Sequence, residues 1–402
     1  MVTRVTLDAS QPHFVLLASD HDPRVDAFQQ ALQQQGLRPA SLISYCDFIT
    51  QPERLTHELT RFDQQKIILR IDSPGRDQHA YTAILQQGIS PLRAAKRPYQ
   101  TAYAIQQQIQ QKGRMIAPYQ FYAGFKGVMQ QVKQTVLSLP DLQNVHDVQL
   151  MNSPDDILLA FDKYRCQRYL QQHKIPIPEL LGSIQSYTEL RQKMRQYNMP
   201  RVFIKLKHGA SAAGVVALES SANKIQIRST VEYQPKTKAL YNTRRLTRSC
   251  NENTIIELIN ALCQMDVYAE RWIPKAQIAE HIVDVRIVVI GGKAQHSVLR
   301  MSKSPITNLH LLNQRADTTQ LQQQMSTSAW QAVLATCEQV AALFPQSLYI
   351  ALDIAIAVNF NKHVVLEVNA FGDLLKAVLY RGLTPQEAEI QHMLINANLC
   401  DI

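Results

Sequence analysis

The chain has 402 residues, of which 46% are hydrophobic and 19% are charged, a composition that can bury several cores and excludes a disordered protein. No apolar run reaches the roughly 18 residues of a membrane-spanning helix, and the first 20 residues lack the apolar core of a signal peptide, so we expect a cytoplasmic protein with no membrane partner. The net charge of +9 comes from dispersed lysines and arginines, which favours a basic cleft for an anionic ligand and disfavours a nucleic-acid partner.

Strand-like and helix-like segments alternate at the start of the chain. Apolar residues 14–19 precede a helical segment at 24–35, and apolar residues 66–71 precede a second helical segment at 78–87. A glycine follows each helical segment, as expected for a helix end. This alternation predicts an open α/β domain in which helices pack on a parallel sheet.

Two polar turns, at 20–23 and 72–76, follow the predicted strands. In open parallel sheets ligands lie beyond the carboxyl ends of the strands, so these turns are candidate binding loops. Asp, Ser, Pro and Gly also form ordinary turns, and this simpler interpretation is favoured for both segments. Arg70, at the end of the second strand, is the strongest candidate for a substrate contact in this domain.

A second unit follows the helical stretch 98–139, because Leu139-Pro140-Asp141 ends that stretch and predicts a domain boundary near residue 150. Beyond it the pattern predicts, in chain order, a helix that starts after Ser153, strands at 202–207, 214–219 and 224–229, a helix at 253–263, a strand at 267–270, and hairpins at 282–301 and 348–369. A basic cluster, Arg244, Arg245 and Arg248, is interpreted as a solvated loop, with contact to an acidic or peptidic substrate as the alternative.

The hairpin at 348–369 carries the strongest chemical signal. On its first strand the large side chains share one face, and Asp353 lies on the other face among alanines. On the returning strand Glu367 and Asn369 point to one side, and a turn of odd length would place Asp353 opposite one of them. Two carboxylates and an amide oxygen are suitable ligands for magnesium. A solvated polar face is the alternative, which is disfavoured because facing acids repel without a cation.

Cationic residues on the preceding hairpin, at 282–301, extend this signal. Arg286 and Arg300 lie on its two strands, and Asn308 follows in the next loop. Arginines that contact a transferring phosphoryl group neutralise the charge that develops on it. Surface ion pairing is the alternative interpretation of these residues.

Two lysines, Lys163 and Lys205, are candidate phosphate ligands. Lys205 precedes the small-residue loop 208–214, which contains Ser211 and could place backbone amides over phosphate oxygens. A loop of small residues can also form an ordinary hairpin turn. Its sequence matches neither the P-loop nor the dinucleotide-binding glycine pattern, so both of those folds are disfavoured.

Seven short motifs follow one another along residues 150–380: Asn152-Ser153, Asp162-Lys163, Phe203-Ile204-Lys205 with the loop after it, Glu270-Arg271-Trp272-Ile273-Pro274, Asp284-Val285-Arg286, Asn308-Leu309-His310 and Leu366-Glu367-Val368-Asn369. This series resembles the ATP-grasp superfamily, and most of all its RimK-like branch of amino-acid ligases. Ile306 departs from the pattern, because RimK-like ligases carry a basic residue two positions before the loop asparagine.

The resemblance implies a two-subdomain ATP-grasp fold, of mixed α/β and α+β class, preceded by an open α/β domain. It divides the chain into a pre-ATP-grasp substrate domain at 1–150, a central and lid subdomain at 151–268, and a C-terminal subdomain with the metal site at 269–402. It also implies that the segment from about 201 to 266 closes over the site as a lid.

The cofactors that the resemblance implies are ATP and two magnesium ions, for which Mn²⁺ could substitute. The implied ATP contacts are Lys163, Lys205, Ser211, the hinge Glu270-Arg271-Trp272-Ile273, and Asp284 near the ribose. The implied metal ligands are Asp353, Glu367 and Asn369. The implied catalytic residues, which would steady the γ-phosphate and an acyl phosphate, are Arg286, Arg300 and Asn308.

The resulting hypothesis is an ADP-forming carboxylate–amine ligase that makes an amide or peptide bond through an acyl phosphate. Its partners would be ATP, a carboxylate substrate such as an amino acid, peptide or small acid, and an amine nucleophile that could itself be peptidic. Two alternatives remain: a kinase that phosphorylates a hydroxyl on the same scaffold, and a non-catalytic ATP-binding module. A homodimer is compatible with all three hypotheses.

Overall fold

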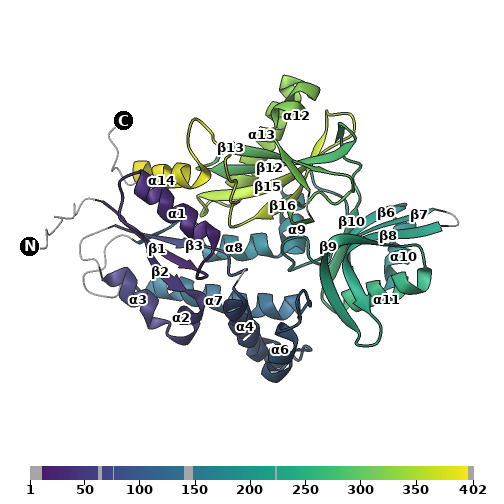
Figure 1. Ribbon diagram of the computed structural model, residues 1–402, viewed down its shortest axis with the longest axis horizontal. Coiled ribbons are helices and arrows are strands. Elements are labelled where there is room, and N and C mark those ends of the chain that lie inside the picture. The colour runs from purple at the N-terminus through teal and green to yellow at the C-terminus, as the bar shows by residue number, and fades with distance from the viewer. Residues whose placement is uncertain are drawn as a thin grey trace, which may run out of the picture.

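The chain folds around three β-sheets. The computed structural model describes residues 11–61, 66–75, 77–139, 148–221, 224–311 and 313–396. Figure 1 shows the N-terminal domain in purple and blue, a six-stranded sheet in teal at the opposite end, and a second six-stranded sheet in green and yellow above them. We call the teal sheet the central sheet and the green and yellow one the C-terminal sheet.

The N-terminal domain has a parallel sheet with the strand order β2-β1-β3-β4. Its strands are β1 (His13–Ala18), β2 (Ser41–Ser44), β3 (Ile67–Ile71) and β4 (Val148–Leu150). Its helices are α1 (Pro23–Gln34), α2 (Tyr45–Thr50), α3 (Glu53–Thr60), α4 (Gln78–Gln87), α5 (Ile89–Ala94), α6 (Ala102–Ile109) and α7 (Pro118–Ser138). Strands β1 and β3 are buried along their whole length because apolar clusters cover both faces, which explains their uninterrupted apolar sequences. The predicted α/β architecture is confirmed, whereas Pro140 and Asp141 of the predicted boundary lie outside the described residues.

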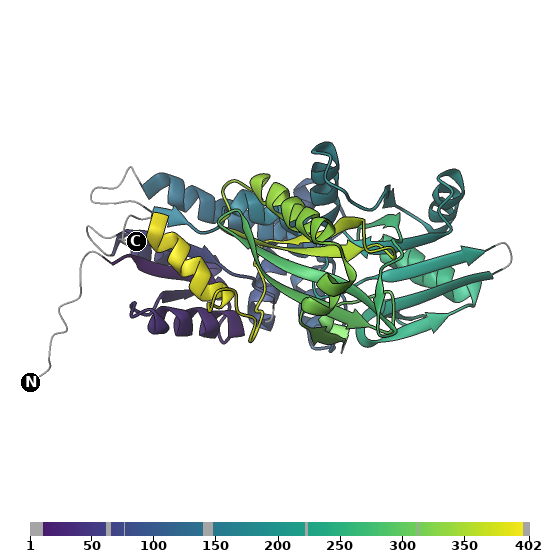
Figure 2. The same ribbon diagram turned by 90° about the horizontal axis from the view of Figure 1, so that it is seen from above.

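The central sheet is antiparallel, with the order β5-β10-β6-β7-β8-β9. Its strands are β5 (Leu180–Ile184), β6 (Arg201–Leu206), β7 (Val216–Ser221), β8 (Lys224–Gln234), β9 (Ala239–Ser249) and β10 (Val267–Arg271). Helices α10 (Tyr187–Gln196) and α11 (Glu252–Cys263) contribute, with the strands, to a separate hydrophobic core. Phe203 and Ala217 instead cluster with Ile306 of the C-terminal part, so this sheet has one face toward its own helices and one toward its neighbour. Figure 2 shows the sheet projecting from one end of the molecule.

The arginine cluster is exposed to solvent, as predicted, but its assignment to a loop is wrong. Arg244, Arg245 and Arg248 lie on β9, which pairs with β8 in a long hairpin, and Arg248 is directly opposite Arg228. Backbone hydrogen bonds to β8 hold this strand whatever side chains it carries. Its charged residues break the alternation of apolar and polar positions by which strands are recognised in a sequence.

The C-terminal sheet has the order β14-β13-β12-β15-β16, and the short β11 also pairs with β12. Its strands are β11 (Gln277–Ile278), β12 (His281–Ile290), β13 (Lys293–Ser302), β14 (Gln314–Ala316), β15 (Tyr349–Ile356) and β16 (His363–Asn369). Helix α13 (Thr327–Ala342) packs against β12, β13 and β15, whereas α8 (Pro154–Phe161) and α9 (Lys163–Gln172) pack against β16. The remaining elements are η2 (Leu309–Leu311), α12 (Thr319–Gln324) and α14 (Pro385–Asn396).

Both predicted hairpins are confirmed, as β12–β13 and β15–β16. Between β12 and β13, Gly291 and Gly292 have φ values of 55° and 75°. One common type of two-residue hairpin turn has this left-handed conformation at both central residues, which glycine adopts without strain. None of the described helices is both long and apolar enough to cross a membrane.

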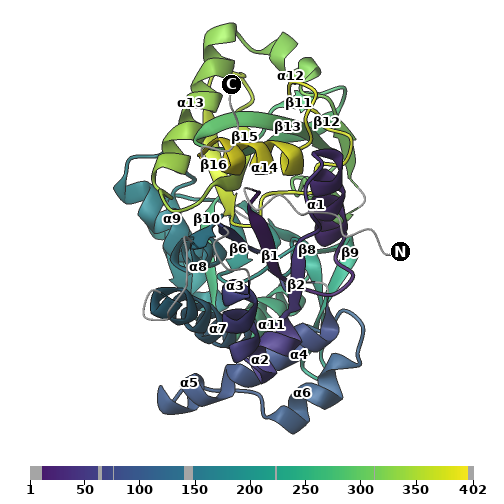
Figure 3. The same ribbon diagram turned by 90° about the vertical axis from the view of Figure 1, so that its left-hand side faces the viewer.

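Arg70 connects the N-terminal domain to the end of the chain. It is only 1% exposed, and its guanidinium donates to Asp72 at 2.8 Å and to Glu389 of α14 at 2.5 Å. The guanidinium carbon also lies 4.6 Å from the ring centre of Phe28 and 4.8 Å from that of Tyr349. Helix α14 accordingly lies beside α1, as Figures 1 and 3 show. The interpretation of Arg70 as a substrate contact is therefore wrong, because the side chain is sealed in this interface.

Candidate functional site

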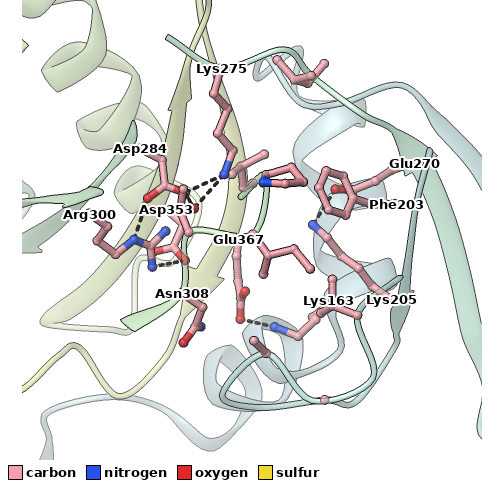
Figure 4. Close-up of a pocket in the computed structure, with 18 of the residues that line it drawn as sticks. Lys163, Phe203, Lys205, Glu270, Lys275, Asp284, Arg300, Asn308, Asp353 and Glu367 are labelled. Atoms are coloured by element: carbon pink, nitrogen blue, oxygen red, sulfur yellow. Dashed lines mark hydrogen bonds and ion pairs between the residues drawn. The ribbon is translucent and has the colours of Figure 1, made fainter. Parts of the chain in front are cut away.

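Two adjoining cavities lie where the central sheet meets the C-terminal sheet. The inner pocket has walls from both sheets, with Phe203 and Glu270 on one side and Asp353 on the other (Figure 4). The outer cleft, with a volume of about 450 Å³, extends to Arg24 and Ser73 of the N-terminal domain. The residues that line both cavities, and so mark their junction, are Lys163, Gly209, Ala212, Arg300, Asn308 and Glu367.

Strand register builds an ion network at the wall formed by the C-terminal sheet. Arg286 of β12 is directly opposite Asp353 of β15, and its Nε and Nη2 donate to the two carboxylate oxygens at 2.6 and 3.0 Å. Arg300 of β13 is directly opposite Asp284 of β12. Its Nε donates to Asp284 at 2.6 Å and its Nη1 donates to Asp353 at 2.9 Å. The two arginines therefore share one carboxylate and are held in fixed positions.

The arginines keep the two buried acids ionised. Burial alone would raise the pKa of Asp353, but Arg286 and Arg300 hold that pKa well below its usual value. Burial opposes ionisation of Asp284 as well, and Arg300 with Lys275 lowers its pKa in the same way. Both carboxylates are thus anionic at neutral pH although Asp353 is only 5% exposed.

A β-bulge at Leu366 brings the two candidate metal ligands together. From Ile356 to Ile354 the partners on β16 run from His363 to Val365, a register that would place Asp353 opposite Leu366. The register shifts at this point, and Asp353 pairs with Glu367 instead. The predicted juxtaposition of the two carboxylates is confirmed, but one extra residue in β16 creates it, and the six-residue turn between the strands does not.

The oxygen donors fit a magnesium ion that arrives with a nucleotide. Asp353 and Glu367 face the same cavity, and Asn369, two residues on, lines the outer cleft. Lys163 forms an ion pair with Glu367, so this carboxylate also has a cation as its partner. Within the described part of the chain no group of three or more His, Cys, Asp or Glu side chains could hold a metal. Magnesium commonly uses one or two carboxylates together with water and substrate phosphates, and the present donors suit that mode.

The opposite wall of the inner pocket combines apolar contact with one buried ion pair. Phe203 lies directly opposite Glu270 in the central sheet, and the Lys205 ammonium is 2.5 Å from the Glu270 carboxylate. Ile273 and Ile306 also line this pocket. Apolar walls with a few placed polar groups are typical of small-molecule and cofactor sites.

No protein-family model matches the sequence, and no curated protein matches it either. Solved structures do resemble the protein. The ATP-grasp ligase PsnB complexed with a minimal precursor superposes with a TM-score of 0.53 at 13% identity, covering 96% of this chain and 99% of PsnB. D-cycloserine synthetase DcsG superposes with a TM-score of 0.52 at 12% identity, again covering 96% and 99%. PsnB with minimal precursor, Mg and ADP gives 0.51 at 13% identity, covering 98% and 99%.

The chain has the ATP-grasp fold. The match extends over nearly the whole length of each chain and so includes the N-terminal α/β domain as well as the two sheets around the cavities. The ATP-grasp fold predicted from the motifs is therefore confirmed. Placement in the RimK-like branch stays a prediction.

Within the ATP-grasp fold, the predicted site residues gather around the two cavities with one exception. Those that line the inner pocket, the outer cleft or both are Lys163, Lys205, Ser211, Glu270, Arg271, Ile273, Asp284, Arg286, Arg300, Asn308, Asp353, Glu367 and Asn369. Trp272 lines neither cavity, and its ring instead packs 5.3 Å from that of Phe203. The side chain of Arg271 bonds to Glu179, so a ligand contact from Arg271 would rely on its backbone. The ligand roles of all these residues stay predictions.

The small-residue loop crosses the junction of the cavities in a strained conformation. Ser211 and Ala212 have φ values of 54° and 61°, which L-residues rarely adopt, and Gly214 follows at 71°. Such conformations cost about 1–3 kcal/mol each and persist where the surroundings impose them, most often at ligand sites. The loop begins next to His208, whose ring stacks on Tyr122 at 4.0 Å.

Sequence reasoning missed two residues of the ion network. The side chain of Lys275 is only 7% exposed, and its ammonium bonds to Asp284 at 2.8 Å and to Thr307 at 2.7 Å. Asp373 accepts from Arg286 at 2.8 Å. Each follows a recognised motif by one to four residues, so a search of the flanking positions for charged residues would have found both.

Proposed function

We propose that the protein is an ADP-forming carboxylate–amine ligase, with ATP in the inner pocket and the carboxylate substrate in the outer cleft. The observation that carries this proposal is the junction of the two cavities, where Lys163, Arg300 and Glu367 line both. At this junction the γ-phosphate of ATP would lie between the rest of the nucleotide, in the inner pocket, and the substrate carboxylate, in the outer cleft. The neighbouring ATP-grasp structures support the assignment through their fold.

The proposed nucleotide site assigns separate tasks to the walls of the inner pocket. The base would pack against Phe203 and Ile306, with the backbone of 270–273 at its edge and Asp284 toward the ribose. Lys205 and Lys163 would contact the phosphates, beneath the strained loop that contains Ser211. These residues would orient ATP with its γ-phosphate at the outer cleft.

Asp353, Glu367 and Asn369 would hold one or two magnesium ions, and Mn²⁺ could substitute for them. The metal, when bound, neutralises charge on the phosphoryl oxygens. Arg286 and Arg300 now share Asp353, and the network of Lys275, Arg286, Arg300, Asp284, Asp353 and Asp373 is electrically neutral, with three cations and three carboxylates. Anionic phosphates would attract guanidinium groups from this network, which is where transition-state charge needs them.

The proposed reaction has two steps. A carboxylate oxygen of the substrate attacks the γ-phosphorus, the bond to the β-phosphate oxygen breaks, and ADP leaves. The amine then attacks the carbonyl carbon of the acyl phosphate, inorganic phosphate leaves, and the amine loses a proton. Arg286, Arg300 and Asn308 would orient the acyl phosphate and stabilise its charge.

The test is whether the release of ADP and phosphate requires both a carboxylate and an amine. Hydroxylamine in place of the amine should yield a hydroxamate, whereas a kinase would give a phosphorylated product and no hydroxamate. If magnesium–ATP binds but no acid or alcohol in a broad panel stimulates ADP release, a non-catalytic module is the better description and the proposal fails.

Replacement of one metal ligand provides the matched variant. We expect Glu367→Gln to lower the rate of ADP release by at least about 100-fold, because transition-state charge loses its neutralising partner, while the circular dichroism spectrum stays unchanged. Glu257→Gln, on the exposed side of α11, is the control and should retain the native rate. An unchanged rate in Glu367→Gln would refute the metal assignment.

A further inference from the structure

The charges that line the outer cleft do not balance. Its cations are Arg24, Lys163, Arg286, Arg300, Arg315 and Lys376, and its carboxylates are Asp22, Glu367 and Asp373. Some of these cations also have acidic partners in the inner pocket, as Arg300 does in Asp284 and Asp353.

Four of these groups, Lys163, Glu367, Arg286 and Arg300, take part in ion pairs. Lys163 pairs with Glu367, and the two arginines of the network share three carboxylates with Lys275. Arg315 and Lys376 are different, because both are exposed and neither forms an ion pair or side-chain hydrogen bond within the described part of the chain. The unbalanced positive charge therefore lies at these two residues.

Arg24 adds unused hydrogen-bonding capacity on the facing wall. Its guanidinium approaches Asp22 only to 3.7 Å, and its Nε is buried without a hydrogen-bond partner. Asp22 itself caps the start of α1 by accepting from the Arg24 backbone. The side chain of Arg24 is therefore held at the cleft but not saturated.

The three cations come from separate segments to one cavity. Arg315 of β14 is directly opposite Arg300 of β13, so its side chain leaves the same face of the C-terminal sheet as the catalytic arginine candidates. Lys376 follows β16, and Arg24 belongs to the N-terminal domain. Arg315 and Lys376 give the cleft a positive potential, and Arg24 adds an unused hydrogen-bond donor, so the cleft favours a ligand with more negative charge than one carboxylate.

We infer that the substrate carries a second anionic group, a carboxylate or a phosphate, which Arg315, Lys376 and Arg24 bind while the first carboxylate lies at the junction of the cavities. The inference rests on the proposed function, since it takes the outer cleft as the carboxylate site. It defines the substrate class as dianionic acids and assigns selection between acids to residues outside the catalytic network.

Equilibrium binding tests the inference without relying on turnover. The protein, saturated with magnesium and a nonhydrolysable ATP analogue, is titrated calorimetrically with glutarate, with its monoamide, and with 4-phosphonobutyrate. We expect at least one of the dianions to bind about tenfold or more tightly than the monoamide, as charge-assisted contacts to a second anionic group provide. The stronger of the two dianions identifies the second group as carboxylate or phosphate.

Variants test whether Arg315 and Lys376 cause the preference for dianions over the monoamide. In the double variant Arg315→Gln/Lys376→Gln the ratio of dianion to monoamide affinity should fall toward one, whereas Lys362→Gln, in the exposed β15–β16 turn, should keep the native ratio. Equal affinities for the dianions and the monoamide in the native protein, or an unchanged ratio in the double variant, would overturn the inference. Loss of ADP release with every acid, alongside a preserved dianion preference, would instead refute only the proposed reaction.

Discussion

Replacing Arg70 by methionine should destabilise the protein strongly, because two buried carboxylates would lose their cation. Asp72 and Glu389 are 0% and 2% exposed, and Arg70 donates to them at 2.8 and 2.5 Å. Removing one partner of a buried ion pair costs about 3–5 kcal/mol. The contacts of the guanidinium with the rings of Phe28 and Tyr349 are lost too. We expect a total loss of about 4–6 kcal/mol.

Thermal unfolding followed by near-UV circular dichroism measures this loss. At roughly 2–4 °C per kcal/mol for a unit of this size, the melting temperature should fall by about 10–20 °C. The matched control adds Asp72→Asn and Glu389→Gln to Arg70→Met, which removes all three charges and should recover part of the loss. A melting temperature within about 2 °C of the native value, or a triple variant no more stable than the single one, would refute the charge-burial argument.

Two further predictions concern the bulge and pH. Deleting Leu366 removes the bulge but leaves Glu367 directly after Val365, and so opposite Asp353 in regular register. ADP release should therefore stay within about tenfold of the native rate, and a loss as large as in Glu367→Gln would contradict this register. Burial raises the pKa of Glu389 despite Arg70, so the folded state binds its proton more tightly and stability falls as pH rises from about 4.5 through the raised value. Denaturant titrations across this range should show a flatter pH profile for Glu389→Gln, and an unchanged profile would contradict the assignment.

The parts of the fold that the sequence predicts are those with a regular local pattern. The buried strands β1 and β3 and the hairpin β15–β16 have apolar runs or alternation that a single segment displays. Strand β9 has neither pattern, and it is identified as a strand by its pairing with β8. The periodicity of apolar residues carries no information on which strand pairs with which, so it does not identify a strand that lacks this periodicity.

The contacts of individual site residues were predicted only where they depend on neighbouring positions in the sequence. Asp353 and Glu367 were recognisable because acids on an otherwise apolar hairpin are unusual, but the bulge that joins them is a backbone feature with no sequence signature here. Arg70 was misinterpreted because its partner Glu389 lies 319 residues away along the chain. A charged residue at a strand end is equally compatible with a ligand contact and a buried pair until that partner is known.

Helix α14 has a consequence for how the protein is made. The N-terminal sheet emerges from the ribosome early, but its central strand carries Arg70, whose second carboxylate partner is on α14. Until that helix has been synthesised, the guanidinium pairs with Asp72 alone and the faces of Phe28 and Tyr349 around it are incomplete, since Tyr349 also comes late. The N-terminal domain therefore completes this buried contact only after α14 has been synthesised.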